Sequence, residues 1–364
     1  MKILLFIDTL NSGGAQRQIV NLSILLKNRG YDVLLLRYYH HNHFKTVLDS
    51  HQIESVLITS TYKFMRIYKL YKFLIFFKPN VLISFLDIPS LISSLASLFI
   101  NHHKLIVSER VMEIGKPSKV RRLLRNLYFS VDHITTNSFG NKELILSNKP
   151  KVHNKLSVIY NSVDFTKFYP NSNGLTKDIR FIVVASFRKT KNPQGLVKAI
   201  KIIIESNVNI NFKLDWYGHK NPNKIEDNSS SVYDEAISLI KKYNLQNIIK
   251  FKDPVEKIEN EYRNSTALIL PSFTEGVPNV VCESMACGLP ILLSNVADAD
   301  ILIENKKNGF LFNPYNTEDI AREILNFINL PFEKKVKMGQ ANVVKARKLF
   351  APERYCEDYI KLFK

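Results

Sequence analysis

Two glutamates, Glu275 and Glu283, lie either side of seven residues in the segment Pro271 to Pro290, PSFTEGVPNVVCESMACGLP. A carboxylate can accept paired hydrogen bonds from neighbouring hydroxyl groups, so each glutamate suits a polyhydroxylated ligand such as a sugar or a ribose. The structural alternative is a helix-capping carboxylate and a surface carboxylate, which helix N-termini also favour. The spacing by itself leaves both interpretations open.

A basic loop, Ser186 to Asn192 (SFRKTKN), places Arg188 and Lys191 just before Pro193. Asn192 followed by proline predicts an N-cap and the first residue of a helix. A guanidinium, an ammonium and a helix N-terminus together stabilise the negative charge that builds up on a departing diphosphate. The alternative interpretation is a solvated basic surface loop.

Short apolar runs precede both segments and predict β-strands at Ala267 to Leu270 and Arg180 to Ala185. Lys2 to Ile7 is a similar run that leads into a helix near Ala15. Strand and helix patterns alternate through both halves, which is typical of α/β folds with parallel sheets, whose ligands bind beyond the carboxyl ends of the strands. We therefore predict two doubly wound domains. Further predicted strands are Val81 to Phe85, Lys104 to Val107, Phe212 to Tyr217, Ile248 to Phe251 and Ile291 to Leu293.

The domain boundary is predicted from length and composition. A chain of 364 residues exceeds the usual size of a single hydrophobic core. The stretch Tyr160 to Gly174 is rich in Asn, Ser and Pro and predicts a linker. We predict domains at residues 1–165 and 166–345, with a C-terminal helix, 346–364, packing back on the first domain. The polar run Asn221 to Ser231 is predicted to be a surface loop.

The glutamate segment, with its EGVPN and ESMACGLPI motifs, resembles the E-x7-E element of retaining GT-B glycosyltransferases, most closely glycosyltransferase family 4 (glycosyl transferases group 1). YNSVD after Ile159 and NGFLF at Asn308 to Phe312 extend the resemblance, which is weaker between Tyr38 and Ser130. The resemblance implies two Rossmann-like domains facing across a cleft and a nucleotide-sugar donor, with UDP the most expected nucleotide.

The resemblance also implies roles for individual residues. Glu275 would lie near the donor sugar and Glu283 on the ribose. Relatives usually place the phosphate-binding arginine where this chain has Ser186, so we assign that role to Arg188 together with Lys191. Asn279 is predicted to cap the helix that carries Glu283. Backbone N–H groups are further donor-binding candidates, and they belong to Gly276, Val277 and Asn279.

The first domain contributes acceptor-side candidates. The loop NSGGAQRQ resembles the family's N-terminal glycine loop; its Gly13 and Gly14 permit close approach of the donor, and Arg17 is a candidate for an acceptor phosphate. A simple structural turn is the alternative. Many relatives carry a histidine near the place where this chain has Ser108, Glu109 and Arg110. Because that histidine is replaced here, no catalytic base is assigned. Glu109 is either positioned by Arg110 beside the acceptor hydroxyl or part of a structural ion pair.

We expect no metal and no cofactor. Asp298 and Asp300 form a D-x-D pattern, but two aspartates supply few ligands, and basic residues already suit the diphosphate. The cysteines, Cys282, Cys287 and Cys356, lack metal-ligand spacing and predict reduced thiols in a cytoplasmic protein.

The formal net charge is +18, and residues 1–165 carry 22 Lys and Arg against 10 Asp and Glu. This excess predicts an anionic partner. Two stretches, Thr61 to Lys78 and Lys116 to Arg125, mix basic and large apolar residues and predict peripheral contact with the inner face of the cytoplasmic membrane; helices with solvated lysines are the alternative. Val81 to Ile100 is long enough to span a bilayer, but Asp87 and Pro89 favour a strand followed by a helix at Ser90 to Phe99.

The sequence therefore predicts a retaining transferase that moves a sugar from a nucleotide onto a glycan or a polyprenyl-diphosphate-linked acceptor, in synthesis of a bacterial surface polysaccharide such as O-antigen. A GT-B sugar-nucleotide epimerase or a phosphorylase would use related chemistry. A basic nucleic-acid-binding protein would explain the charge, but no nucleic-acid-binding motif is present and the glutamate segment would be left unexplained, so we expect no nucleic acid partner.

Overall fold

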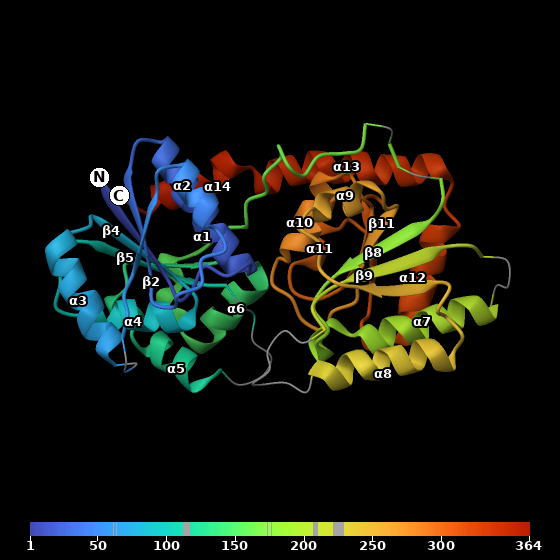
Figure 1. Cartoon of the computed structure of the whole chain (residues 1–364), viewed down its shortest axis with the longest axis horizontal. Helices are drawn as coiled ribbons and strands as arrows, with labels where there is room; N and C mark the ends of the chain where they lie inside the picture. Colours follow the sequence, from blue (N-terminus) through green and yellow to red (C-terminus); the bar gives the residue numbers. More distant parts are fainter. Residues whose placement is uncertain are drawn as a thin grey trace. The chain divides into compact units, whose positions relative to one another are not determined.

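The computed structural model describes residues 1–60, 62, 64–110, 112, 117–172, 174–175, 177–206, 210–220 and 229–364. The chain divides into two compact units, which we call unit 1 (Met1–Ser162 with Pro352–Lys364) and unit 2 (Val163–Ala351). The division after Ser162 lies within the predicted linker, whereas the return to unit 1 begins at Pro352 rather than at residue 346. Helix α13 (Phe332–Phe350) therefore belongs to unit 2 and α14 (Pro352–Lys361) to unit 1 (Figure 1).

Unit 1 is built on a parallel sheet of seven strands in the order β3-β2-β1-β4-β5-β6-β7, as far as the structure describes it. The strand order runs outward in both directions from β1 and β4, which makes this a doubly wound sheet. Side chains of β1 alternate between its two faces, with Leu4 and Phe6 on one and Ile3 and Leu5 on the other. The strands are β1 (Lys2–Ile7), β2 (Asp32–Arg37), β3 (Glu54–Leu57), β4 (Val81–Phe85), β5 (Lys104–Glu109), β6 (His133–Thr136) and β7 (Leu156–Val158).

Helices cover both faces of this sheet (Figure 1). Leu70, Ile92, Leu124 and Ile145 bring α3, α4, α5 and α6 into the core on one face. The opposite face is covered by α1, α2 and α14. The bounds of the helices are α1 (Gly14–Asn28), α2 (Lys45–Ser50), α3 (Met65–Phe77), α4 (Asp87–Ser97), α5 (Lys119–Asn126) and α6 (Phe139–Asn148), with 3-10 helices η1 (Tyr128–Ser130) and η2 (Pro150–Lys155).

Unit 2 repeats this architecture with a parallel sheet in the order β10-β9-β8-β11-β12-β13. Apolar side chains of α7, α8 and α12, such as Leu196, Ile240 and Ile324, form the core on one face. Figure 1 shows α9 and α10 on the other side of the sheet. The elements are β8 (Arg180–Val184), η3 (Lys189–Lys191), α7 (Pro193–Ser206), β9 (Lys213–Tyr217), α8 (Ser229–Lys242), β10 (Ile249–Lys252), α9 (Ile258–Arg263), β11 (Ala267–Leu270), α10 (Asn279–Ala286), β12 (Ile291–Ser294), α11 (Ala299–Leu302), β13 (Gly309–Phe312) and α12 (Thr317–Ile328).

The predicted strands at β1, β4 and β11 are confirmed to the residue, and others differ at their ends. β5 continues through Ser108, which pairs with both β4 and β6, to Glu109, which pairs with Thr136 of β6. Helix α4 begins at Asp87, where proline is tolerated in the first turn. Of the predicted polar loop at 221–231, residues 221–228 lie outside the described part and Ser229 already begins α8.

The suspected membrane span at 81–100 divides into β4 and α4. Across the described residues, no helix combines the length and the apolar character needed to cross a bilayer.

Candidate active site

The basic loop and the glutamate segment of unit 2 meet at the carboxyl ends of adjacent parallel strands. β8 pairs with β11, so the loops that follow these strands leave the sheet at the same edge. The backbone N–H of Phe273 donates to the carbonyl of Thr190 at 2.8 Å, which joins the two loops directly. The Phe273 ring also stacks on Tyr315, in the loop after β13, with ring centroids 4.8 Å apart.

Two of the predicted catalytic side chains form an ion pair. The Lys191 ammonium donates to the Glu275 carboxylate, and both side chains are mostly shielded from solvent. Shielding strengthens the attraction between opposite charges. The pair holds a cation suited to phosphate beside an acceptor suited to sugar hydroxyls, which the sequence indicated only as two separate motifs.

Asn192 ends the basic loop and begins α7 in the predicted manner. Its side-chain oxygen accepts the Gly195 N–H at 3.1 Å, while its amide donates to the Pro314 carbonyl at 2.9 Å. The residue has a left-handed backbone with φ of 54°, which asparagine tolerates better than most residues. Proline at position 193 then begins the helix, so the N-terminus of α7, with its partial positive charge, lies directly after Arg188 and Lys191.

The Arg188 side chain is half-buried, and within the described part of the chain it has no ion-pair partner. The loop that carries Arg188 is held by β9 and by the residues that follow it. The Trp216 indole donates to the Ala185 carbonyl at 2.7 Å, and the Phe187 N–H donates to His219 at 3.1 Å. Gly218 permits this approach, because a Cβ there would overlap the Ala185 carbonyl oxygen. No local motif in the sequence marks Gly218.

Glu283 is 5% exposed and lies in α10. Its carboxylate accepts from the hydroxyl of Tyr262, at 3.3 Å, and Tyr262 is a fully buried residue of α9 that the sequence analysis also missed. The predicted cap of α10 is wrong by one residue. Pro278 is the cap, with extended backbone, and Asn279 is the first helical residue; the helix ends at Ala286. Gly276 and Val277 lie in the loop between Glu275 and this helix.

Comparison with known proteins decides the class of enzyme. Residues 165–343 match the family model described as Glycosyl transferases group 1. The chain is 24% identical, over 100% of its length and 98% of the relative's, to the GalNAc-alpha-(1->4)-GalNAc-alpha-(1->3)-diNAcBac-PP-undecaprenol alpha-1,4-N-acetyl-D-galactosaminyltransferase of Campylobacter jejuni. The UDP-Gal:alpha-D-GlcNAc-diphosphoundecaprenol alpha-1,3-galactosyltransferase of Escherichia coli is 27% identical, with 52% of this chain matching 51% of that protein. The chain is a glycosyltransferase.

The fold of this glycosyltransferase is also that of a solved structure. A crystal structure of Anabaena HepE in complex with UDP-glucose aligns with a TM-score of 0.84 at 18% identity, covering 99% of this chain and 98% of the other. At this identity the likeness shows the fold. The glycosyltransferase therefore has the two Rossmann-like domains of the GT-B architecture, and the group 1 segment lies in unit 2.

In unit 1 of the glycosyltransferase, the glycine loop follows β1 as predicted. Gly14 begins α1, and Gly13 precedes it with an extended backbone, so this turn needs no positive φ. A Cβ at position 13 would overlap the end of the Gln16 side chain, which would have to shift. Gln16 in turn donates to Asp8 at 3.4 Å, and burial raises the pKa of Asp8. Arg17 is half-buried in the first turns of α1.

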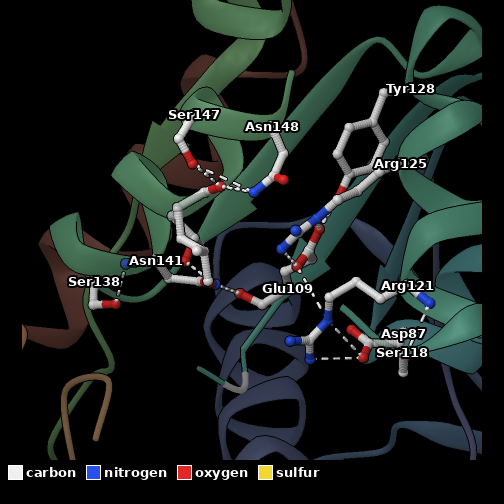
Figure 2. Close-up of polar contacts among 12 residues, drawn as sticks. Asp87, Glu109, Ser118, Arg121, Arg125, Tyr128, Ser138, Asn141, Ser147 and Asn148 are labelled. Atoms are coloured by element: carbon white, nitrogen blue, oxygen red, sulfur yellow. Dashed lines mark hydrogen bonds and ion pairs between the residues drawn. The ribbon is translucent and has the colours of Figure 1, made fainter. Parts of the chain in front are cut away.

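The predicted partnership between Glu109 and Arg110 is wrong. Glu109 is fully buried and its carboxylate is held by Arg125 at 2.9 Å, with a second contact to Arg121 at 3.5 Å. Figure 2 shows both arginines pointing toward Glu109, together with the Tyr128 hydroxyl that donates to it. Burial and the Glu109 carboxylate raise the pKa of Tyr128 well above its ordinary value. Glu109 therefore forms a structural cluster and is not open to an acceptor hydroxyl.

Arg110 directly follows β5 and has different partners from Glu109. Its guanidinium donates to Ser108 and to Tyr359 of α14, at 3.2 Å each, and also to Asn161. The ring of Phe85 lies against it, 4.4 Å from ring centroid to guanidinium carbon. Arg110 thus joins the C-terminal helix of unit 1 to its sheet, which is a structural role.

Asp298 is buried at the cap of α11, whereas Asp300 is exposed. The two carboxylates of the D-x-D pattern therefore lie in different environments. Within the described residues, no group of three or more His, Cys, Asp or Glu side chains is arranged to hold a metal ion. All three cysteines are unpaired and buried, and burial raises the pKa of Cys287 to about 12.

The Glu109 cluster predicts a large effect on stability. Replacing Glu109 by Gln keeps the volume but leaves the buried Arg125 charge without its carboxylate, so the free energy of unfolding should fall by about 3 to 5 kcal/mol. Urea unfolding followed by circular dichroism measures this change. The exposed carboxylate of Glu143 provides the matched control, Glu143→Gln, which should be nearly neutral. Similar stabilities for the two variants would show that the cluster does not stabilise unit 1.

Proposed function

We propose that this glycosyltransferase moves a sugar from UDP to a glycan or polyprenyl-diphosphate-linked acceptor, with retention of anomeric configuration, in bacterial surface polysaccharide synthesis. The observation that carries the proposal is the Lys191–Glu275 ion pair at the carboxyl edge of the unit 2 sheet. A phosphate-binding cation and a hydroxyl-binding carboxylate are held together there, next to the N-terminus of α7.

The diphosphate leaving group accounts for the positive side of this arrangement. As the bond between the anomeric carbon and the diphosphate oxygen breaks, negative charge grows on the phosphate oxygens. Lys191, the half-buried Arg188 and the N–H groups that begin α7 would stabilise that charge without having to move. Lys191 would then be shared between Glu275 and the diphosphate.

The carboxylates account for recognition of the two sugar rings. Glu275 would accept hydrogen bonds from hydroxyls of the transferred sugar, and Glu283 from the ribose. Glu275 is engaged by Lys191, so we assign it to orienting the sugar rather than attacking it. The acceptor oxygen would bond to the anomeric carbon from the leaving-group side, through an oxocarbenium-like transition state, and its proton would pass to the departing diphosphate.

The acceptor class is inferred from the relatives. The names of the Campylobacter jejuni and Escherichia coli enzymes both specify an undecaprenol carrier with a diphosphate, and the second also specifies UDP-galactose. We infer the same kind of acceptor for this enzyme. Gly13, Gly14 and Arg17, in the loop after β1, remain our candidates for contacts with donor and acceptor.

A lipid-linked acceptor requires access to a membrane, and unit 1 presents a basic and aromatic surface on helices that cover one face of its sheet. We define the membrane surface by five exposed residues of α3, α5, η1 and the turn after α4: Lys72, Phe76, Phe99, Arg122 and Phe129. α4 packs between α3 and α5, as Figure 1 shows. Large aromatic residues beside cations suit the headgroup region of an anionic bilayer.

Arg121 does not belong to this surface. It is 3% exposed and donates to Asp87 at 2.7 Å. The composition of Lys116 to Arg125 predicted a basic surface along the whole stretch. Helix α5 instead buries Arg121 and Arg125 and exposes Lys119 and Arg122. Within the two predicted basic stretches, Thr61, Lys63 and Lys116 lie outside the described residues.

The leaving-group role predicts a loss of turnover. Arg188→Ala combined with Lys191→Ala should lower kcat with a saturating donor by about a hundredfold or more, because fixed charge opposite the diphosphate is lost. Radiolabelled sugar transfer measures it. Lys189→Ala, an exposed lysine of the same loop, is the control and should retain parental turnover. A double variant as fast as the control would exclude this mechanism.

The ribose role predicts a loss of nucleotide affinity. Glu283→Ala should weaken UDP binding by roughly tenfold to a hundredfold, the usual range for a hydrogen bond to a charged group. Tyr262→Phe leaves the carboxylate in place and should have a smaller effect. Isothermal titration calorimetry compares both with Glu333→Ala, which removes an exposed carboxylate. Unchanged affinity in Glu283→Ala would refute the assignment.

Membrane contact is tested by flotation with phosphatidylglycerol vesicles. Lys72→Gln with Arg122→Gln should weaken binding by about 2 kcal/mol, at about 1 kcal/mol for each charge near an anionic surface. The control is Lys334→Gln with Lys337→Gln, which removes two exposed lysines from α13. Failure of the parental protein to float would end the membrane proposal.

A further inference from the structure

A pocket of about 340 Å³ lies in unit 1, at the carboxyl ends of β2 and β3 and the first turns of α3. Its described lining residues all belong to unit 1. Parallel sheets bind ligands at this edge, and the neighbouring strand β1 carries the glycine loop at the same edge. The described residues that line the pocket are Tyr38, Tyr39, His40, Thr59, Ser60, Arg66 and Lys69.

Arg66 is the most informative of these residues. Its guanidinium lies over the rings of Tyr38 and Tyr39, with its central carbon 4.2 and 4.9 Å from the ring centroids. The Nε atom is buried and has no hydrogen-bond partner within the described part of the chain. A donor removed from water without a partner is costly, and stacking on aromatic rings compensates only in part. The guanidinium is therefore held in position with hydrogen-bonding capacity to spare.

The rest of the pocket is cationic or polar. Lys69 follows Arg66 by three residues on α3, which places both side chains on the same side of the helix. Its ammonium donates to the Thr59 carbonyl and so lies at the pocket. Arg37 donates to the Tyr39 carbonyl at 2.8 Å and to that of His40 at 3.2 Å, which braces the loop after β2.

No carboxylate is among the described lining residues. Asp8 is one carboxylate close to the pocket, since its backbone carbonyl accepts from the N–H groups of Tyr38 and Tyr39. Its side chain instead accepts from the Thr9 N–H at 2.7 Å and from Gln16. The positive charge of Arg66 and Lys69 is thus not balanced by an ion pair among the described residues, in contrast to that of Arg121 and Arg125.

A planar guanidinium and an ammonium converge on one pocket. Together they suit a phosphate ligand, with its tetrahedral oxygens, better than they suit a ligand with a single carboxylate. The N-terminal turn of α3 adds partial positive charge. We propose that this pocket binds the diphosphate group of the lipid-linked acceptor. The inference rests on the proposed acceptor class and adds the subsite that would hold it. A membrane phospholipid also offers phosphate, so the experiment must separate the two sources.

The first measurement is calorimetric titration of inorganic pyrophosphate. It uses the Arg188→Ala and Lys191→Ala background, which removes the phosphate-binding cations of unit 2. Arg66→Ala should lower the remaining affinity for pyrophosphate at least about tenfold. Arg66→Lys keeps the charge but not the planar donors, so its affinity should lie between those of the background and of Arg66→Ala. Lys45→Ala, an exposed lysine of α2 on the same unit, should bind as the background does. Equal affinity in all variants would overturn the proposal, and Arg66→Lys keeps it testable if Arg66→Ala fails to fold.

The second measurement identifies the source of the phosphate, with farnesyl diphosphate as a soluble probe and phosphatidylglycerol vesicles as a membrane. Arg66→Ala should weaken binding of farnesyl diphosphate and leave flotation unchanged. Loss of flotation with unchanged binding of farnesyl diphosphate would assign the pocket to phospholipid and overturn the proposal.

Neither measurement requires turnover, so the subsite can be tested even if the proposed transfer reaction is wrong. If transfer is detected, Arg66→Ala should also raise KM for a diphosphate-linked acceptor while UDP affinity stays at the parental value. A higher KM accompanied by weaker UDP binding would contradict an acceptor subsite.

Discussion

Parallel pairing of β8 with β11 is the constraint on which the candidate active site depends. Lys191 and Glu275 are 84 residues apart in the chain, yet they pair because their loops leave neighbouring strands at the same edge. Parallel strands also place the N-terminus of each following helix at that edge. Cation, carboxylate and the helix N-terminus at Pro193 therefore come together through strand order, and Gly218 lets β9 support them from the adjacent position.

The arginines of unit 1 have two kinds of partner, carboxylates or aromatic rings, and this difference bears on function. Arg121 and Arg125 are buried against Asp87 and Glu109, so their charge is neutralised within the fold. Arg66 lies instead over aromatic rings at the edge of the sheet where ligands bind. The net charge of +18 is therefore a poor guide to binding surfaces. Cations buried with their carboxylate partners, such as Arg125 with Glu109, are not available to phosphate or lipid.

The features that the sequence predicted correctly are those that depend on adjacent residues. The strands β1, β4 and β11 could be read to the residue from short apolar runs, and Asn192 with the following proline predicted the start of α7. Errors arose where a neighbouring residue or a distant element decided the outcome. Pro278 rather than Asn279 caps α10, and β5 extends to Glu109 because β6 continues to pair with it there.

The sequence by itself determined the alternation of strands and helices, the two glutamates at their spacing and the basic loop, because each is a pattern within a few adjacent residues. Only the tertiary structure decided the partners: Arg125 rather than Arg110 for Glu109, Tyr262 for Glu283, and two tyrosine rings for Arg66. These partners are set by the order of strands in each sheet and by which face of a strand or helix a side chain occupies. Neither follows from the spacing of residues along the chain.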